Sequence, residues 1–264
     1  MLSKSRISLV RSLKHKKFRM LNGLFVAEGE KIVKDLLTTS PEKNFFNIDS
    51  IYATSEWSAK NKNGIIAGPD ITEVPDEELK RISSLITPNK VLAVVRIPDF
   101  KQDKDLIMND LTLVLEDIQD PGNLGTIIRI AHWFGIKQIF CSENSTDIYN
   151  PKTIQSAMGS LWSVKVFYTE LSSFIKYYYE STDLPVIGTF LKGISIYNRQ
   201  PVTKGLVVLG NEARGISEKL VPYMRTRVTI PAYNENSRPD SINVGMSAAI
   251  ICSELRRDKL SHSK

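Results

Sequence analysis

Cysteine and histidine are scarce in this chain of 264 residues, which has two of the former and three of the latter. Cys141 and Cys252 both lie in apolar runs, so we expect buried free thiols in a reducing, cytoplasmic compartment and no disulfide framework. The spacing of these residues matches no zinc motif, and we expect no metal site. No run of about 18 apolar residues is present, so the sequence predicts no contact with a membrane through a spanning helix.

The glycine-containing segment 205–216 lacks both common nucleotide-binding signatures. The Walker loop needs Gly-Lys followed by Ser or Thr, and the dinucleotide fingerprint needs Gly-x-Gly-x-x-Gly; neither occurs there. A Rossmann dehydrogenase is therefore excluded. Net charge is +6, which suits a polyanionic partner.

Acidic residues are absent from the first 27 positions, whereas basic residues are frequent between Lys4 and Arg19. One interpretation is a mitochondrial transit peptide, because the segment is basic and contains serine. It runs directly into 24–29, which reads as a strand and a turn, with no linker between, so a folded basic surface is favoured. The predicted contacts of this surface with a polyanion are Arg11, Lys14, Lys16, Lys17 and Arg19.

Two α/β parts follow from the pattern of apolar runs. Residues 1–100 form a small unit, with strands predicted at 23–27, 48–53 and 91–96 and helices at 29–37, 55–61 and 76–85. The charged segment 101–110 is the predicted linker. In 111–264 strands and helices alternate, and the strands are continuous apolar runs, which indicates a mostly parallel sheet covered on both faces. The strands are expected at 111–116, 137–141, 164–167, 185–190, 205–209 and 227–230, and the helices at 121–134, 151–158, 171–179 and 243–256.

Three segments of the second part place Gly, Asn, Ser and one charged residue where a predicted strand ends, which is where an open α/β sheet binds its ligand. They are Asn-Leu-Gly-Thr-Ile-Ile-Arg at 123–129, Leu-Gly-Asn-Glu-Ala-Arg-Gly-Ile at 209–216, and Ile-Pro at 230–231 followed by Asp-Ser-Ile-Asn-Val-Gly-Met-Ser at 240–247. Taken singly they have simpler interpretations, namely a strand–helix turn, a helix N-terminal acid at Glu212, and an N-cap pair at Ser241 and Asn243. Arg129 lies between two isoleucines, so we expect its side chain to lean toward the loop or to find a partner.

In this order the three segments resemble the SpoU/TrmH family of S-adenosylmethionine-dependent RNA ribose methyltransferases. The resemblance covers 110–257 strongly and 5–37 more weakly. Two departures stand out: Gly245 replaces a serine of the family pattern, and the loop between Ile230 and Ser241 is a few residues longer.

The resemblance implies a C-terminal SPOUT domain, an α/β fold with a deep trefoil knot, and a smaller N-terminal α/β domain that is related to ribosomal proteins and binds the RNA substrate. It implies a homodimer with S-adenosylmethionine as cofactor and no metal. By residue match, the implied catalytic residues are Asn123, Arg129, Glu212, Ser241 and Asn243, and the implied cofactor-binding residues are Thr189, Gly210, Ile230 and Ile242.

The implied reaction is methylation of a ribose 2′-hydroxyl, with Arg129 near the RNA phosphate and the attacking ribose. Ribosomal RNA is the favoured substrate, with transfer RNA as an alternative. A catalytically silent RNA-binding or ribosome-assembly factor on the same scaffold is the second hypothesis, which Gly245 and the long third loop keep open. We expect Gly210→Val to abolish cofactor binding while leaving the fold intact, because Gly210 permits close backbone approach to a ligand.

Overall fold

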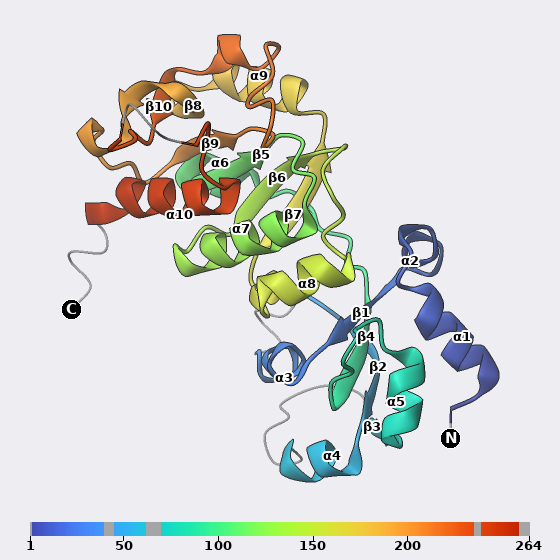
Figure 1. Cartoon of the computed structure of the whole chain (residues 1–264). Helices are drawn as coiled ribbons and strands as arrows, with labels where there is room; N and C mark the ends of the chain where they lie inside the picture. Colours follow the sequence, from blue (N-terminus) through green and yellow to red (C-terminus); the bar gives the residue numbers. More distant parts are fainter. Residues whose placement is uncertain (1, 40–44, 62–69, 235–238, 259–264) are drawn as a thin grey trace. The chain divides into compact units, whose positions relative to one another are not determined.

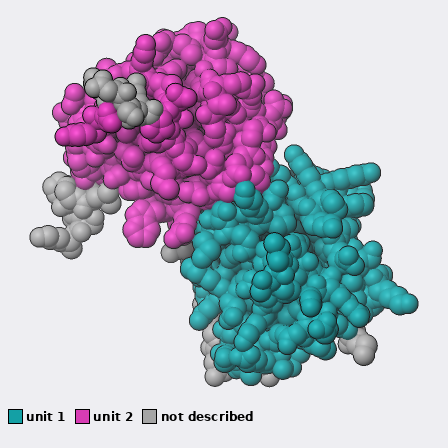
Figure 2. All heavy atoms as spheres, viewed as in Figure 1, with its two compact units in different colours: residues 1–99, 147–163 teal, residues 100–146, 164–264 magenta. Residues whose placement is uncertain are grey.

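A computed structural model describes residues 2–39, 45–61, 70–234 and 239–258, which form two compact units (Figure 2). Unit 1 consists of residues 1–99 and 147–163, and unit 2 of residues 100–146 and 164–264. The boundary near residue 100 lies beside the predicted linker 101–110. Segment 147–163 belongs to unit 1, whereas the sequence prediction includes it in 111–264. The predicted linker 101–110 also contains a helix, Lys104–Asn109, whose Ile107 is buried in unit 2.

Unit 1 is built on a four-stranded sheet in the order β1-β4-β2-β3 (Figure 1). Strand β4 runs antiparallel to both of its neighbours, and β2 and β3 are parallel. The strands are β1 (Leu24–Glu28), β2 (Ile48–Ala53), β3 (Ile71–Glu73) and β4 (Val91–Arg96). The helices are α1 (Lys4–Ser12), α2 (Lys16–Asn22), α3 (Glu30–Thr38), α4 (Ser55–Asn61), α5 (Asp76–Ile82) and α8 (Pro151–Ala157), with the 3₁₀ turn η2 (Ser160–Trp162).

The basic N-terminal segment is folded, as predicted. Its two helices, α1 and α2, were not predicted from the sequence. Ser3 caps α1 by accepting a hydrogen bond from the Arg6 amide, and Gly23 ends α2 in the left-handed conformation. Val10 and Leu13 are buried in one cluster with residues of β1, β2 and β4. Residues 4–22 therefore form part of the core of unit 1.

Segment 147–163 completes the core of unit 1. The Phe25 ring of β1 lies 4.6 Å from the ring of Tyr149 and 6.3 Å from that of Trp162. The Trp162 indole donates a hydrogen bond to the carbonyl of Ile32 (3.1 Å), and the Gln155 amide donates to the carbonyl of Glu28 (2.6 Å). These buried contacts join residues more than a hundred positions apart in the chain, so no local pattern could reveal them.

Unit 2 is an α/β layer structure around a six-stranded sheet in the order β10-β8-β9-β5-β6-β7, in which all neighbours are parallel, as the apolar runs predicted. The strands are β5 (Leu111–Leu115), β6 (Gln138–Ser142), β7 (Lys165–Thr169), β8 (Val186–Ser195), β9 (Gly205–Leu209) and β10 (Thr226–Thr229). The helices are α6 (Lys104–Asn109), α7 (Pro121–Trp133), α9 (Leu171–Ser181) and α10 (Val244–Leu255), with the 3₁₀ turns η3 (Ile196–Asn198) and η4 (Val221–Tyr223).

Helices cover both faces of this sheet. On one face, α6 and α9 pack against alternate strand residues such as Val114 and Val208. Helices α7 and α10 lie side by side on the opposite face (Figure 1). Among the described residues, no helix is long and apolar enough to cross a bilayer, and no group of three or more His, Cys, Asp and Glu side chains could hold a metal ion.

The two thiols are expected to be unreactive in the folded protein. Cys141 and Cys252 are both buried and free, and burial raises the pKa of each thiol, that of Cys252 to about 12. Because the thiolate is the reactive form, Ellman's reagent at pH 8 should modify neither residue in the native protein and both after denaturation in guanidinium chloride. Rapid modification of the native protein would contradict this arrangement.

Candidate functional site

Three of the four predicted cofactor residues lie on or just after three neighbouring strands, where the regular pairing of these strands ends. In the sheet, Gly188 of β8 pairs with Val208 of β9 and with Arg227 of β10. Thr189, Gly210 and Ile230 follow these positions directly or within three residues, so all three lie at the same edge of the sheet. The pairing of β8 with β10 shifts there, so that Val228 faces Ile194 and residues 189–193 leave the regular ladder.

Three of the five predicted catalytic residues are joined by their side chains. Asn123 lies in the first turn of α7, Glu212 in the loop after β9, and Asn243 is the N-cap of α10. The Asn123 amide donates to the Glu212 carboxylate (Oε1, 3.0 Å), and the Asn243 amide donates to Oδ1 of Asn123 (2.9 Å). We call this chain the Asn–Glu–Asn triad. It links the three sequence segments that were singled out.

Local capping fixes the orientation of the triad amides. Asn243 Oδ1 accepts hydrogen bonds from the amides of Gly245 (2.9 Å) and Met246 (3.3 Å), which leaves the Asn243 Nδ2 group to reach Asn123. The backbone amide of Asn123 donates to Oδ1 of Asp120, the N-cap of α7 (3.0 Å). The N-cap interpretation of Asn243 is therefore correct, and the cap also builds the triad.

Arg129 and Ser241 stand outside the triad. Both side chains are exposed, and no hydrogen bond or ion pair joins Arg129 to another described residue. Arg129 thus finds no partner among the described residues of this chain, and its lean toward the loop stays a prediction. Its neighbour Ile128 is buried, but one residue further turns the side chain about 100° around the helix, which brings Arg129 to the solvent.

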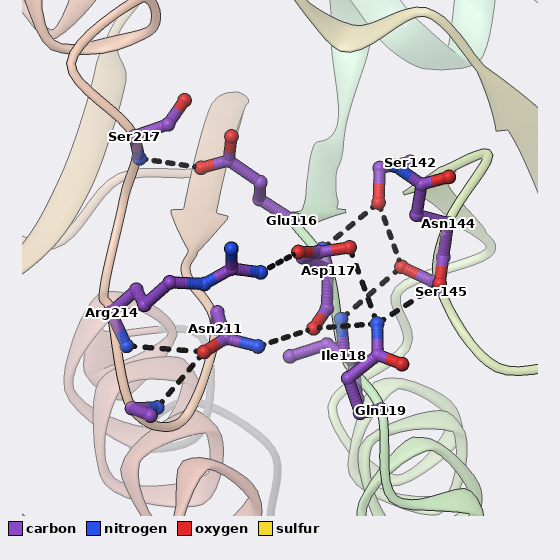
Figure 3. A network of polar contacts seen from close by, with 11 residues as sticks. Glu116, Asp117, Ile118, Gln119, Ser142, Asn144, Ser145, Asn211, Arg214 and Ser217 are labelled. Carbon is purple, nitrogen blue, oxygen red and sulfur yellow. Dashed lines mark hydrogen bonds and ion pairs between the residues drawn. The ribbon is translucent and has the colours of Figure 1, made fainter.

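A second polar network, which the sequence analysis missed, ties the ends of β5 and β9 (Figure 3). Asp117 has a positive φ of 60° just after β5. Its carbonyl accepts from the Asn211 amide (2.8 Å), and its carboxylate pairs with Arg214. The side-chain oxygen of Asn211 in turn accepts from the amides of Ala213 (3.0 Å) and Arg214 (3.1 Å), so this residue shapes its own loop.

The network extends to the end of β6 and to the turn after Gly215. The Asp117 amide donates to Ser142 Oγ (2.9 Å), which lies 3.0 Å from Ser145 Oγ, and Glu116 accepts from the Ser217 amide (2.8 Å). Figure 3 shows these side chains converging between the strand ends. The sequence signal was present, since polar residues follow each of these apolar strands.

Gly210 is required by the chain itself. A Cβ at this position would lie 2.2 Å from the Gly215 carbonyl carbon and 2.3 Å from the Ile216 nitrogen. The loop folds back there, because Asn211 and Gly215 exchange backbone hydrogen bonds of 3.0 and 2.9 Å. The expectation that Gly210→Val leaves the fold intact is therefore wrong, since any side chain displaces this loop.

Gly245 sits where α7 and α10 approach closely. A Cβ there would meet Thr126 Cγ2 at 3.0 Å and Asn243 Oδ1 at 3.1 Å, so a serine at this position would crowd the capping oxygen. Glycine in place of the family's serine at position 245 therefore leaves room for the capping oxygen of Asn243, which belongs to the triad.

Comparison with known proteins identifies the family of both parts of the chain. The model of the SpoU rRNA Methylase family matches residues 110–253, and that of the MRM3-like substrate binding domain matches residues 4–93. The chain belongs to the SpoU rRNA methylase family, with an MRM3-like substrate-binding domain ahead of the methylase domain.

Relatives match over nearly the whole length. The 23S rRNA (guanosine(2553)-2′-O)-methyltransferase RlmP of Bacillus subtilis is 27% identical over 247 residues, which cover 93% of this chain and 94% of that protein. A solved TrmH-family structure from Porphyromonas gingivalis is 33% identical with a TM-score of 0.85, covering 98% of this chain and 99% of the other. The AdoMet-bound rRNA methyltransferase of Sinorhizobium meliloti is 25% identical with a TM-score of 0.80, covering 98% and 96%.

Proposed function

We propose that this protein transfers the methyl group of S-adenosylmethionine to a ribose 2′-hydroxyl of ribosomal RNA. The observation that carries the proposal is the Asn–Glu–Asn triad, because it joins the three segments of the resemblance at the edge of the sheet where ligands bind. Family membership and the activity of the B. subtilis relative support the choice of reaction and of ribosomal over transfer RNA.

The residues at the sheet edge suit an adenosyl group. Ile242 adjoins Asn243 of the triad and keeps 46% of its surface exposed, and Ile230 is half-buried after β10, so apolar side chains are available to a flat ring. Thr189 and Gly210 complete the set from β8 and β9. When bound, S-adenosylmethionine supplies an electrophilic methyl group on a sulfonium, which is a good leaving group.

Side chains of the protein orient the RNA nucleotide and stabilise the charge that develops on its ribose oxygen. Glu212 and Asn243 hold Asn123 at the start of α7, and Ser241 lies two residues before the cap, so these side chains position the nucleotide. Arg129 holds the adjacent phosphate and stabilises the negative charge that develops on the ribose oxygen. We assign it no role as proton acceptor, because a guanidinium has no free acceptor site.

The active unit is a homodimer in which Arg129 of one subunit reaches the cofactor site of its partner. Arg129 and Trp133 are four residues apart on α7 and therefore share a face of the helix. Trp133 is 83% exposed, and Met246 on the neighbouring α10 is exposed as well. A large aromatic side chain in that position is suited to burial against a second copy.

Two further features remain proposals. The trefoil knot is supported by the sheet order, since β9 lies between β8 and β5 and α10 returns to pack beside α7. A cytoplasmic location is supported by the two free buried thiols, which fit a reducing compartment.

The experiment that tests the function is methyl transfer from radiolabelled S-adenosylmethionine to ribosomal RNA from cells that lack the gene, followed by mapping of 2′-O-methyl sites. Methylation of one ribosomal nucleotide is expected. Labelling of transfer RNA alone would identify transfer RNA, and not ribosomal RNA, as the substrate. A protein that binds RNA but not S-adenosylmethionine would favour the silent scaffold.

Ile242→Glu is expected to reduce S-adenosylmethionine binding at least tenfold while the protein stays folded. The half-exposed side chain can change without overlap in the core, but a buried carboxylate beside an adenine ring is costly. Calorimetric titration measures the affinity, and Tyr177→Glu, an exposed position on α9, is the matched control. Equal affinity of both variants and the wild type would remove Ile242 from the cofactor site.

A further inference from the structure

A buried arginine organises the turn between α1 and α2. Arg19 is only 2% exposed, although it belongs to the basic N-terminal segment. Its Nη1 group donates to the carbonyls of Leu13 and Lys14, both at 2.8 Å. The prediction that Arg19 contacts RNA is therefore wrong, because its guanidinium points inward and fixes the backbone of the turn.

The counter-charge of Arg19 comes from segment 147–163. Asp147 Oδ2 accepts from Nη2 (2.6 Å) and Nε (3.1 Å) of Arg19, while its Oδ1 accepts from the Tyr149 amide (3.0 Å). Every carboxylate oxygen thus has a partner. The turn is held from inside by a satisfied ion pair, which restricts the conformations open to its exposed residues.

The outward side of the same turn combines positive charge with apolar surface. Lys14, Lys16 and Lys17 are all exposed. Beside them Phe18 is 37% and Leu21 74% exposed, and the His15 ring meets Phe18 edge to face at 6.4 Å between centroids. We call residues 14–21 the basic turn.

This combination favours one form of RNA. Lysines bind phosphates of any nucleic acid, single- or double-stranded, without reading the bases. Exposed aromatic and aliphatic side chains are useful only where base faces are accessible, which requires unpaired nucleotides. A protein partner would gain from the apolar groups but would need a complementary acidic surface for the three lysines.

We infer that the basic turn is a binding surface for an unpaired stretch of the RNA substrate, in which the lysines hold phosphates and Phe18 and Leu21 contact bases. The inference rests on the proposed function and adds to it, since it gives the substrate a single-stranded element outside the methylation site. Arg19 and Asp147 act as positioning residues that keep this surface in place.

The test measures binding of the full-length protein to a fluorescent single-stranded oligoribonucleotide and to the duplex of the same sequence, by anisotropy at several salt concentrations. The double variant Phe18→Ala/Leu21→Ala should lose roughly tenfold affinity for the single strand, as removal of a base-stacking contact does, and little for the duplex. Its salt dependence should stay unchanged. Ile86→Ala removes a fully exposed apolar side chain of unit 1 outside the turn and should have no effect.

A triple variant, Lys14→Glu/Lys16→Glu/Lys17→Glu, should weaken binding of both forms and flatten the salt dependence by roughly two in the log–log slope, at about 0.7 per phosphate contact. Equal losses for single strand and duplex in the Phe18/Leu21 variant, or no loss, would overturn the inference. If that variant melts early, Leu21→Ala alone repeats the test. S-adenosylmethionine binding and methyl transfer by the wild type are measured alongside, and their absence would instead refute the proposed function.

Discussion

Arg129→Ala is expected to lower turnover by a factor on the order of 100 while leaving S-adenosylmethionine affinity unchanged, because the lost group acts on the RNA phosphate and on the charge that develops in the transition state, not on the cofactor. The exposure of Arg129 means that its removal leaves no cavity and no unpaired buried charge, so the folded state should be as stable as the wild type. Single-turnover methylation assays and calorimetry measure the two quantities. Near-normal turnover would contradict the assignment.

The variant Arg129→Lys distinguishes the contribution of the positive charge from that of the planar guanidinium. Lysine keeps the positive charge but lacks the planar fork of donors, so we expect little recovery of turnover. If each site is shared between subunits, co-expression of Arg129→Ala with Ile242→Glu should form heterodimers with one intact site and up to half of the wild-type activity. Heterodimers without any recovery would argue against a shared site.

Asp147→Ala is expected to destabilise unit 1 by about 3–5 kcal/mol, because it leaves the Arg19 guanidinium buried without a counter-charge. Urea unfolding measures the loss. Asp35→Ala is the matched control in the same unit: Asp35 pairs with Lys31 at 2.8 Å on the surface, where such a pair contributes about 0–1 kcal/mol.

The same variant should also bind RNA more weakly, since Arg19 no longer fixes the turn that carries Lys14 and Lys16. A double change, Arg19→Met/Asp147→Leu, should restore much of the stability by replacing the ion pair with apolar groups, but not the RNA affinity. Full recovery of RNA affinity in the double variant would show that the ion pair has no positioning role. A stability loss in Asp147→Ala no greater than in Asp35→Ala would contradict the burial of the pair.

The strands and the position of the site follow from local patterns. Continuous apolar runs such as 205–209 mark strands buried on both faces, and in a parallel sheet all carboxyl ends meet at one edge, which is enough to bring Asn123 and Glu212 together. The exposure of Arg129 could not be predicted, because the apolar residues beside it do not show which sector of α7 the core occupies.

Features that depend on distant partners could not be predicted. Arg19 resembles the other basic residues of its segment, and only Asp147, 128 positions away, distinguishes it. The aromatic contacts of Phe25 with Tyr149 and Trp162 could not be predicted either, because these residues are far apart in the sequence. Helix 151–157 was recognised as a helix, but its amphipathic pattern says nothing about which core it joins.

The contribution of residues 147–163 to the core of unit 1 also sets an order of events during synthesis. The first 99 residues emerge from the ribosome without Tyr149, Trp162 or Asp147, so their core is incomplete and Arg19 has no counter-charge. Domains ordinarily fold as they leave the exit tunnel of the ribosome. The core of unit 1 is complete only after more than 60 further residues have been translated. The nascent chain therefore completes the packing beneath the basic turn only after β5 and β6 of the second sheet have been translated, and if that turn binds RNA as inferred, we expect the complete surface to form no earlier.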